Sequence, residues 1–148
     1  MLMNLQQYQS KIRLRSEDGV KQLWGHVRKK WFVLTPEEVV RQCVLLYLME
    51  EKQYSNNLIA VEKTITYYKL KKRYDIVVFD QSMTPLILIE CKSPDVPLDQ
   101  KTFYQIQSYD SVIQGQHLWL TNGHQNIILA KAKHENQLIE CTDIPQSI

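Results

Sequence analysis

The run Arg73-Tyr74-Asp75-Ile76-Val77-Val78-Phe79-Asp80 is followed, after four residues, by Pro85-Leu86-Ile87-Leu88-Ile89-Glu90-Cys91-Lys92. Two segments rich in Ile, Val, Leu and Phe, separated by a polar stretch that ends in proline, predict two strands joined by a tight turn. A loop over residues 81–84 predicts these cross-strand pairs: Asp80 with Pro85, Phe79 with Leu86, Val77 with Leu88, and Asp75 with Glu90.

The last of these pairs places two carboxylates opposite each other. Directly opposed side chains have Cβ atoms about 5 Å apart, and like charges in this arrangement are destabilising. A divalent cation with oxygen ligands would offset the repulsion, and Lys92, on the same strand face as Glu90, would help. Cys91 points to the opposite face, where we expect a small core residue. The spacing alone leaves open a simpler interpretation, in which both acids point into solvent.

Length and composition limit the class of protein. A chain of 148 residues with 44% hydrophobic and 23% charged residues is typical of one soluble globular domain. We expect no membrane span and no signal peptide, because no apolar run approaches about 18 residues and the N-terminus is polar. The three scattered cysteines, Cys43, Cys91 and Cys141, indicate a reducing cytoplasm without a disulfide framework or zinc site.

Basic residues gather near the N-terminus and before the Asp75 strand. Residues 1–35 contain seven lysines and arginines against two acids, and the run Lys69-Leu70-Lys71-Lys72-Arg73 leads into Asp75. This distribution favours a phosphate backbone as partner. A solvated charged surface is the alternative.

The segment Thr35-Pro36-Glu37-Glu38 predicts a helix start. Thr35 can cap the helix, Pro36 suits its first position, and Glu38 has the spacing of a capping box. We expect the helix to continue to about Glu51 and to bury Val40, Cys43, Val44, Tyr47 and Leu48. Glu38 is either a structural cap, which the sequence favours, or a carboxylate directed towards a metal.

The remaining patterns predict a mixed sheet with helices packed against it. Further strands are expected at residues 58–65, 117–121 and 125–130, the last two joined by an Asn122-Gly123 turn, and a second helix over residues 98–114. We expect residues 1–10 to be weakly ordered and residues 12–15 and 20–31 to form edge strands. Trp24, Trp31 and Phe32 are expected to cover the core, with stacking on nucleobases as the less favoured alternative. Residues 1–33 would form an N-terminal extension and residues 34–148 the main domain.

This order of elements, with Asp75 followed by Glu90-x-Lys92, resembles the PD-(D/E)XK nuclease superfamily. The resemblance implies a restriction-endonuclease-like α/β fold, α-β-β-β-α-β-β, with an N-terminal β extension. Over roughly residues 34–123 the chain is similar to the N-terminal nuclease domain of type I restriction enzyme R subunits. The segments that carry this similarity are residues 34–42, 75–78, 88–92, 105–109 and 121–123. Tyr74 stands where the superfamily has its nominal proline.

The resemblance implies a Mg²⁺-dependent DNA endonuclease, in which Mn²⁺ can substitute, acting in restriction, defence or repair. The metal ligands would be Asp75, Glu90, the Cys91 carbonyl and Glu38, with Glu37 as the less favoured helix residue. Lys92 would orient the attacking water and stabilise the phosphate. Gln105 and Tyr109 would position DNA or the metal-bound water. The alternative is a catalytically silent DNA-binding or accessory subunit.

The chemistry of phosphodiester hydrolysis suits these residue types. A carboxylate-held divalent ion supplies both charge neutralisation and a hydroxide-like nucleophile. Lys92 beside two carboxylates is expected to stay protonated, which favours electrostatic stabilisation over a role as base. Since the sequence ends at Ile148 without a Gly-x-x-x-x-Gly-Lys loop, we expect a free-standing nuclease or a separately encoded motor or specificity partner. Cutting both strands would need two sites, which makes a homodimer plausible.

Overall fold

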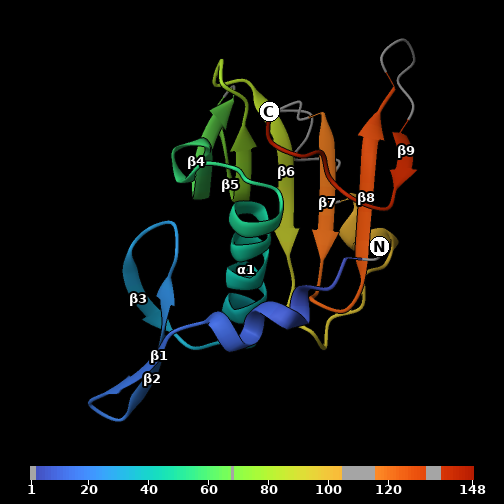
Figure 1. The fold of residues 1–148 in the computed structure, drawn as a ribbon. Helices are drawn as coiled ribbons and strands as arrows, with labels where there is room; N and C mark the ends of the chain where they lie inside the picture. The colour runs from blue at the N-terminus through green and yellow to red at the C-terminus, as the bar shows by residue number, and fades with distance from the viewer. Residues whose placement is uncertain (1–2, 68, 105–115, 133–137) are drawn as a thin grey trace.

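The computed structural model describes residues 3–67, 69–104, 116–132 and 138–148. In this part of the chain, a six-stranded mixed sheet carries the helix α1 on one face, and a small three-stranded sheet stands beside it (Figure 1). The mixed α/β class predicted from the sequence is therefore confirmed. Among the described residues, no helix is both long and apolar enough to cross a membrane.

The large sheet keeps its strands in chain order. Only β6 and β7 run parallel, and every other neighbouring pair is antiparallel. The edge strand β4 had been expected in the centre, and β9 was not predicted. The strands are β4 (Ile59–Tyr67), β5 (Leu70–Phe79), β6 (Pro85–Cys91), β7 (His117–Thr121), β8 (Asn126–Lys131) and β9 (Leu138–Cys141).

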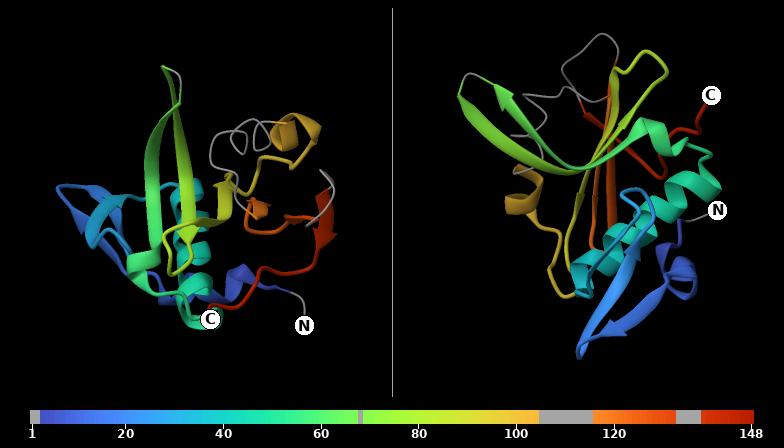
Figure 2. Two further views of the ribbon diagram at one scale, coloured as in Figure 1. Left: turned by 90° about the horizontal axis from the view of Figure 1, so that it is seen from above. Right: turned by 90° about the vertical axis from the view of Figure 1, so that its left-hand side faces the viewer.

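A parallel neighbour requires the chain to cross over one face of the sheet. The connection from β6 to β7 contains a helical segment at residues 100–104, on the face opposite α1 (Figure 2). The second helix expected over residues 98–114 thus begins near the predicted place, and its remainder lies outside the described residues.

The β5–β6 hairpin has the predicted register around its centre but not at its turn. Val77 pairs with Leu88 as expected, whereas Phe79 pairs with Pro85 instead of Leu86 because a bulge follows Val78. The loop therefore begins at Asp80, whose Oδ1 accepts hydrogen bonds from the backbone N–H groups two and four residues later. On the other side of the bulge the predicted register holds as far as the last paired residues, Ile76 and Ile89, and Asp75 and Glu90 are the next residues on the two strands.

Helix α1 (Pro36–Leu46) begins as the sequence predicts. Thr35 Oγ1 accepts a hydrogen bond from Glu38 N at 3.1 Å. After Leu46 the chain makes one π-helical turn, Tyr47–Glu51, so the helical segment ends at the predicted residue but with wider final geometry. The five residues expected to be buried are buried: Val40, Cys43, Val44, Tyr47 and Leu48.

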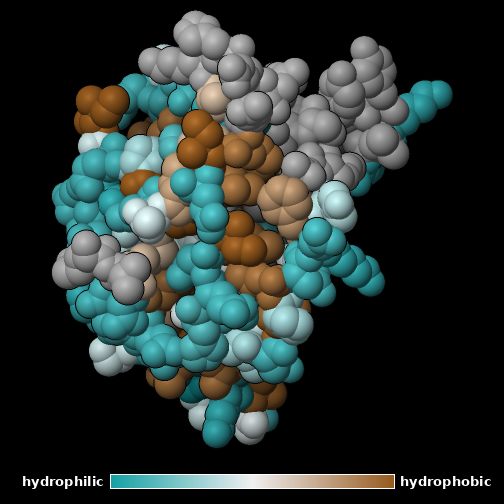
Figure 3. Space-filling model, turned by 90° about the vertical axis from the view of Figure 1, so that its right-hand side faces the viewer, coloured by the Kyte–Doolittle hydropathy of each residue, from teal (hydrophilic) through white to brown (hydrophobic). Residues whose placement is uncertain are grey.

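Two apolar layers cover the two faces of the large sheet. The α1 side holds Ile76, Ile89 and the fully buried Cys91, which confirms the prediction that this cysteine is a core residue. Tyr47 and Trp119 meet edge to face there, with ring centroids 5.8 Å apart. The opposite layer contains Tyr74, Val77, Phe79, Leu88, Leu118 and Leu120. Seen from the β9 side, apolar side chains also reach the molecular surface (Figure 3).

The first residues of the chain are better ordered than their polar composition predicts. Residues 5–11 form a 3₁₀-helix whose Leu5 and Tyr8 side chains are 2% and 5% exposed and belong to the core on the α1 side. The ring of Tyr8 lies 6.2 Å from that of Tyr47. The expected weak order of residues 1–10 is therefore wrong for the described residues 3–10, since two apolar side chains among polar ones suffice to anchor the segment.

The small sheet follows this helix and also differs from expectation. It consists of β1 (Leu14–Glu17), β2 (Val20–Gly25) and β3 (Lys30–Val33), so the single strand predicted over residues 20–31 is two strands with a turn between them. Lys29 has a positive φ of 57° in this turn. Trp24 and Trp31 pair across β2 and β3 and belong to neither core layer of the described residues, so they do not cover the core. The predicted boundary at residue 33 stays a prediction.

Burial of Leu5 predicts that its loss is costly. We expect Leu5→Ala to lower the free energy of unfolding by about 2–4 kcal/mol, because it removes buried methyl groups and leaves a cavity. Leu14→Ala is the matched control: its side chain is 63% exposed, and the expected change is within about 0.5 kcal/mol. Urea unfolding followed by circular dichroism measures both. Equal effects of the two substitutions would contradict the anchoring of the N-terminal helix.

Candidate active site

Asp75, in the middle of β5, and Glu90, near the end of β6, form a close acid pair. Asp75 Oδ2 accepts a hydrogen bond from the backbone N–H of Cys91 at 2.8 Å. Burial, the negative charge of Asp75 and a hydrogen bond between the two carboxyl groups raise the pKa of Glu90 to about 8. At neutral pH the pair therefore holds one proton between two carboxylates.

Lys92 stands next to this pair. Its Nζ lies 3.7 Å from Glu90 Oε1, and its backbone N–H donates to the carbonyl of Thr121 at 2.8 Å, which fixes the chain directly after β6. The side chain is 24% exposed, so the ammonium group can meet a ligand from solvent. The hairpin thus brings Asp75, Glu90 and Lys92 to one place, as the sequence predicted.

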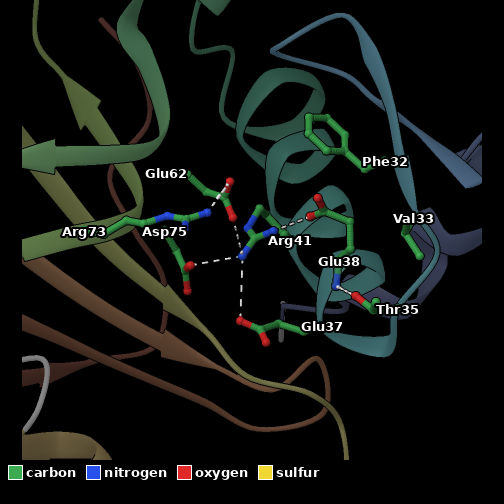
Figure 4. A pocket seen from close by; sticks show the side chains of 9 residues that line it. All are labelled: Phe32, Val33, Thr35, Glu37, Glu38, Arg41, Glu62, Arg73 and Asp75. Carbon is green, nitrogen blue, oxygen red and sulfur yellow. Dashed lines mark hydrogen bonds and ion pairs between the residues drawn. The ribbon is translucent and has the colours of Figure 1, made fainter.

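The guanidinium of Arg41, on α1, lies at the centre of the neighbouring acids (Figure 4). Its Nη1 donates to Glu38 Oε2 at 2.5 Å and its Nη2 donates to Asp75 Oδ1 at 3.0 Å. Oxygens of Glu62 and Glu37 follow at 3.5 Å and 3.7 Å from Nη2. Burial would lower the pKa of Arg41, but Asp75 and Glu38 raise it overall, so the side chain, only 8% exposed, remains charged.

Glu62, on β4, forms a second junction of charges. Its Oε2 accepts from Arg28 at 2.7 Å and lies 2.6 Å from a guanidinium nitrogen of Arg73. Burial would raise its pKa, yet the hydrogen bonds from Arg73 and Arg28 lower it overall. Glu62 has a positive φ of 52°, at the point between the Val61–Ile76 and Lys63–Tyr74 pairs. β4 nevertheless continues on both sides of Glu62 with the same register.

A cavity of about 440 Å³ opens between the start of α1 and strands β4 and β5 (Figure 4). Most of its lining is charged, with Phe32 and Val33 of β3 as the apolar exceptions. The other lining residues are Thr35, Glu37, Glu38, Arg41, Glu62, Arg73 and Asp75. Such a lining suits a small charged group better than an apolar ligand.

The helix acids do not occupy the positions that the resemblance implies. The Glu38 carboxylate pairs with Arg41 and lies 3.5 Å from Arg28, and burial raises its pKa even so. Arg41 therefore stands between Glu38 and Asp75. Glu37 is more exposed, and its charge is one of those that raise the pKa of Glu90. Of the two helix acids, Glu37 is the one that acts on the acid pair.

Asp75 and Glu90 fit a divalent cation, and Glu38 does not fit beside them while Arg41 lies between. The acid pair offers hard oxygen donors, and Mg²⁺ keeps several waters, so few protein ligands are needed. Within the described residues, no group of three or more His, Cys, Asp or Glu side chains could hold a metal. The predicted residues Gln105 and Tyr109 lie outside the described residues.

The sequence analysis did not single out Arg41 or Glu62. Arg41 follows Glu37 and Glu38 by four and three residues, the spacing at which side chains meet on a helix. Glu62 is a charged residue next to the apolar run of residues 58–61. Both signals were present, but neither indicates that the two residues converge on Asp75 from different elements.

The family of the chain follows from a comparison with known protein families. Residues 36–145 match the model described as type I restriction enzyme R protein N terminus, which spans more than half of the chain. The chain belongs to this family. Membership places it in a restriction-related context, and the matched residues include α1, both acids of the pair and Lys92.

Among solved structures, the chain is similar to a fragment assigned to the HsdR subunit of a type I restriction enzyme from Vibrio vulnificus YJ016. The two share 19% sequence identity with a TM-score of 0.49, and the match covers 69% of this chain and 22% of that one. The chain thus spans about a fifth of the length of that relative. No curated protein matches the sequence.

The raised pKa of Glu90 predicts a stability that falls with pH. Between pH 4.5 and about 8 the folded state keeps a proton that the unfolded state has released, so rising pH favours unfolding. The slope for one group is at most about 1.4 kcal/mol per pH unit. Glu90→Gln removes this term, and we expect its stability relative to wild type to increase from pH 5 to 8 and to level off above.

Urea unfolding at several pH values measures this difference. Glu140→Gln, at an exposed position of β9, is the matched control and should parallel wild type throughout. A constant offset between Glu90→Gln and wild type across the range would contradict a proton held by the acid pair.

Arg41 is expected to be the costliest charged residue to replace at this site. Arg41→Met leaves buried acids without their counter-charge, which typically costs about 3–5 kcal/mol of unfolding free energy. Arg73→Met removes a cation from the same network, but that side chain is 63% exposed and its loss should cost less than about 1 kcal/mol. Thermal and urea unfolding measure the loss of stability in both variants. Similarly small losses of unfolding free energy would mean that Arg41 is not the central counter-charge.

Proposed function

We propose that this chain is a metal-dependent DNA endonuclease of the PD-(D/E)XK type, with a restriction-endonuclease-like arrangement of its sheet. The observation that carries the proposal is the acid pair Asp75–Glu90 with Lys92 at its side. Three residues separated by up to 17 positions converge here, and the pair holds a proton at neutral pH. Family membership supports a restriction-related role.

In this proposal Asp75, Glu90 and the Cys91 carbonyl hold Mg²⁺ or Mn²⁺. When bound, the ion supplies a hydroxide-like nucleophile and neutralises charge on the phosphate. The protein itself supplies position and charge. Asp75 is held by hydrogen bonds to both of its oxygens, one from Arg41 and one from Cys91 N. Lys92 contributes its positive charge to the phosphate oxygens, where charge develops during hydrolysis.

The roles of Gln105 and Tyr109, which would position DNA or the attacking water, rest on the resemblance alone. The resemblance favours Glu38 as the helix carboxylate, but Glu38 pairs with Arg41 and the charge of Glu37 raises the pKa of Glu90, so we propose Glu37 for that role. A homodimer would bring two sites to the two strands of a duplex. A motor or specificity subunit would act with the domain, in the cytoplasm.

A second function has a specific observation in its favour. Arg41 already neutralises Asp75 and Glu38, as a counter-charge does in a site that needs no metal. Such a chain would bind DNA or serve as an accessory subunit without cutting. The two functions differ in whether Glu90 and Lys92 matter for anything except stability.

The nuclease proposal predicts metal-dependent cleavage that requires the hairpin residues. We expect purified protein with Mg²⁺ or Mn²⁺ to cut plasmid or single-stranded DNA. Glu90→Gln and Lys92→Met should reduce the rate by about 10²-fold or more, since each removes charge stabilisation at the reacting phosphate. Gel assays of cleavage against time measure the rates.

The matched controls replace exposed residues of the same type: Glu140→Gln and Lys101→Met should cut like wild type. If Glu90→Gln cuts DNA as fast as wild type, the activity does not depend on the acid pair and the proposal is wrong. If wild type does not cut, calorimetry with Mn²⁺ distinguishes the two functions. Heat of binding that disappears in Glu90→Gln indicates a metal site, and its absence in wild type favours the accessory role.

A further inference from the structure

The outer face of the small sheet carries a pair of tryptophans. Trp24 of β2 pairs with Trp31 of β3, and their ring centroids lie 5.2 Å apart with the planes at 67°. Because side chains alternate along a strand, Val20 lies on this face with Trp24, and Val33 lies on it with Trp31. Gln22 lies between Val20 and Trp24 on this face and opposite Val33, so the apolar strip consists of Trp24, Trp31 and Val33, with Val20 beyond a polar side chain.

Arg13, directly before β1, and Arg15, in β1, flank this strip. The guanidinium of Arg13 lies 5.2 Å from the ring centroid of Trp24 and 5.7 Å from that of Trp31, and that of Arg15 lies 4.4 Å from Trp31. Residues 12–33 contain six basic residues against two acids. Arg15 also forms a salt bridge with Glu17 on the same face at 2.5 Å, so the face is aromatic and carries two arginines and one acid.

The strip is open to solvent rather than packed. Val20 and Val33 are 45% and 57% exposed, and both tryptophans are only partly buried. On the other face of the same sheet Leu23 is fully buried, so that face supplies the packing. Figures 1 and 2 show the small sheet standing away from the large one. An exposed apolar patch bordered by charged groups is typical of an interaction surface.

We propose that this face binds a nucleic acid strand through its unpaired bases. Partly exposed indoles offer flat surfaces on which bases stack without regard to sequence, and arginines beside them can bind the phosphates. Duplex DNA presents no free base faces, so an unpaired strand fits the tryptophans better. The nearby positive charge suits the phosphate backbone and disfavours a basic or purely apolar partner.

The location connects this face to the candidate active site. Strand β3 leads directly into α1, and Phe32 and Val33 line the cavity that also contains Asp75. Arg28, in the turn before β3, reaches Glu38 and Glu62 in that cavity. Val33 therefore lies both on the tryptophan face and at the edge of the cavity that contains Asp75. The inference shares with the proposed function the assumption that nucleic acid is the ligand, but it does not require cleavage.

A simpler explanation is that the arginines and tryptophans only stabilise the small sheet. That explanation predicts changes in unfolding but none in nucleic acid affinity when these residues are replaced. An acidic protein partner predicts the same absence of effect on nucleic acid. Binding measurements therefore separate our proposal from both.

The first experiment uses a fluorescent oligothymidine of about 12 nucleotides in EDTA, so that no metal-dependent reaction occurs. We expect Trp31→Ala to weaken binding about tenfold or more and Trp31→Phe to stay within a few-fold of wild type, because phenylalanine keeps a stacking ring. Lys101→Ala, in the helical segment at residues 100–104, is the charge control and should bind like wild type. Unchanged affinity in Trp31→Ala would overturn the proposal.

The second experiment measures how affinity depends on salt. Each phosphate contact contributes about 0.7 to the slope of log affinity against log salt for a single strand, so replacing both Arg13 and Arg15 by alanine should lower the slope by about 1.4. Arg15→Lys keeps the charge and should keep the slope. Circular dichroism confirms that each variant is folded. An unchanged slope in a folded double variant would overturn the proposal. A higher affinity for duplex than for single-stranded DNA would also overturn it.

The two proposals fail separately. Glu140→Gln, at an exposed position of β9 outside both proposed sites, should bind the oligonucleotide in EDTA like wild type. Binding that depends on Trp31 without any cleavage in Mg²⁺ would leave this inference standing and remove the nuclease. Cleavage that depends on Glu90, together with an oligonucleotide affinity that does not change in Trp31→Ala, would support the nuclease and overturn this inference.

Discussion

One buried guanidinium constrains the arrangement of three elements. Arg41, on α1, contacts acids of α1, β4 and β5, and its side chain is almost entirely withdrawn from water. A buried ion pair contributes little net stability because desolvation offsets the attraction, but a missing partner is costly. A shift of the helix on the sheet would therefore leave a buried charge without its partner. The guanidinium contacts Asp75, which β5 carries to the candidate site.

The same guanidinium divides the site into two regions of different character. On the cavity side, Arg28, Arg41 and Arg73 neutralise the acids Glu38 and Glu62. On the side of β6, Glu90 is buried next to an acid, and its pKa rises to about 8. Perturbed acids of this kind are concentrated at functional sites. The chemistry of the domain is therefore to be sought at Glu90 and Lys92 rather than in the middle of the cavity.

Local rules explain what could be predicted from the sequence. The cap at Thr35, the turn at Asn122-Gly123 and the pairing of Val77 with Leu88 depend on neighbouring residues, and all three are present. The bulge after Val78 depends on how the loop closes, which the strand pattern does not contain. The contact of Arg41 with Asp75 joins residues 34 positions apart, and only the packing of α1 on the sheet creates it. The sequence thus predicted the acid pair with Lys92, but not the contact of Arg41 with Asp75.

The family match and the small sheet concern different parts of the chain. The matched residues begin at 36, after β3 has ended at Val33, so the acid pair lies inside the match and the tryptophan face lies before it. Family membership therefore concerns the residues of the hairpin and gives no information about the tryptophan face. Arg28 joins the two regions, since it comes from the turn of the small sheet and ends on Glu62 of β4. Its charge belongs to the network around Arg41, so a ligand that displaced Arg28 would alter the electrostatics of Asp75 without touching it.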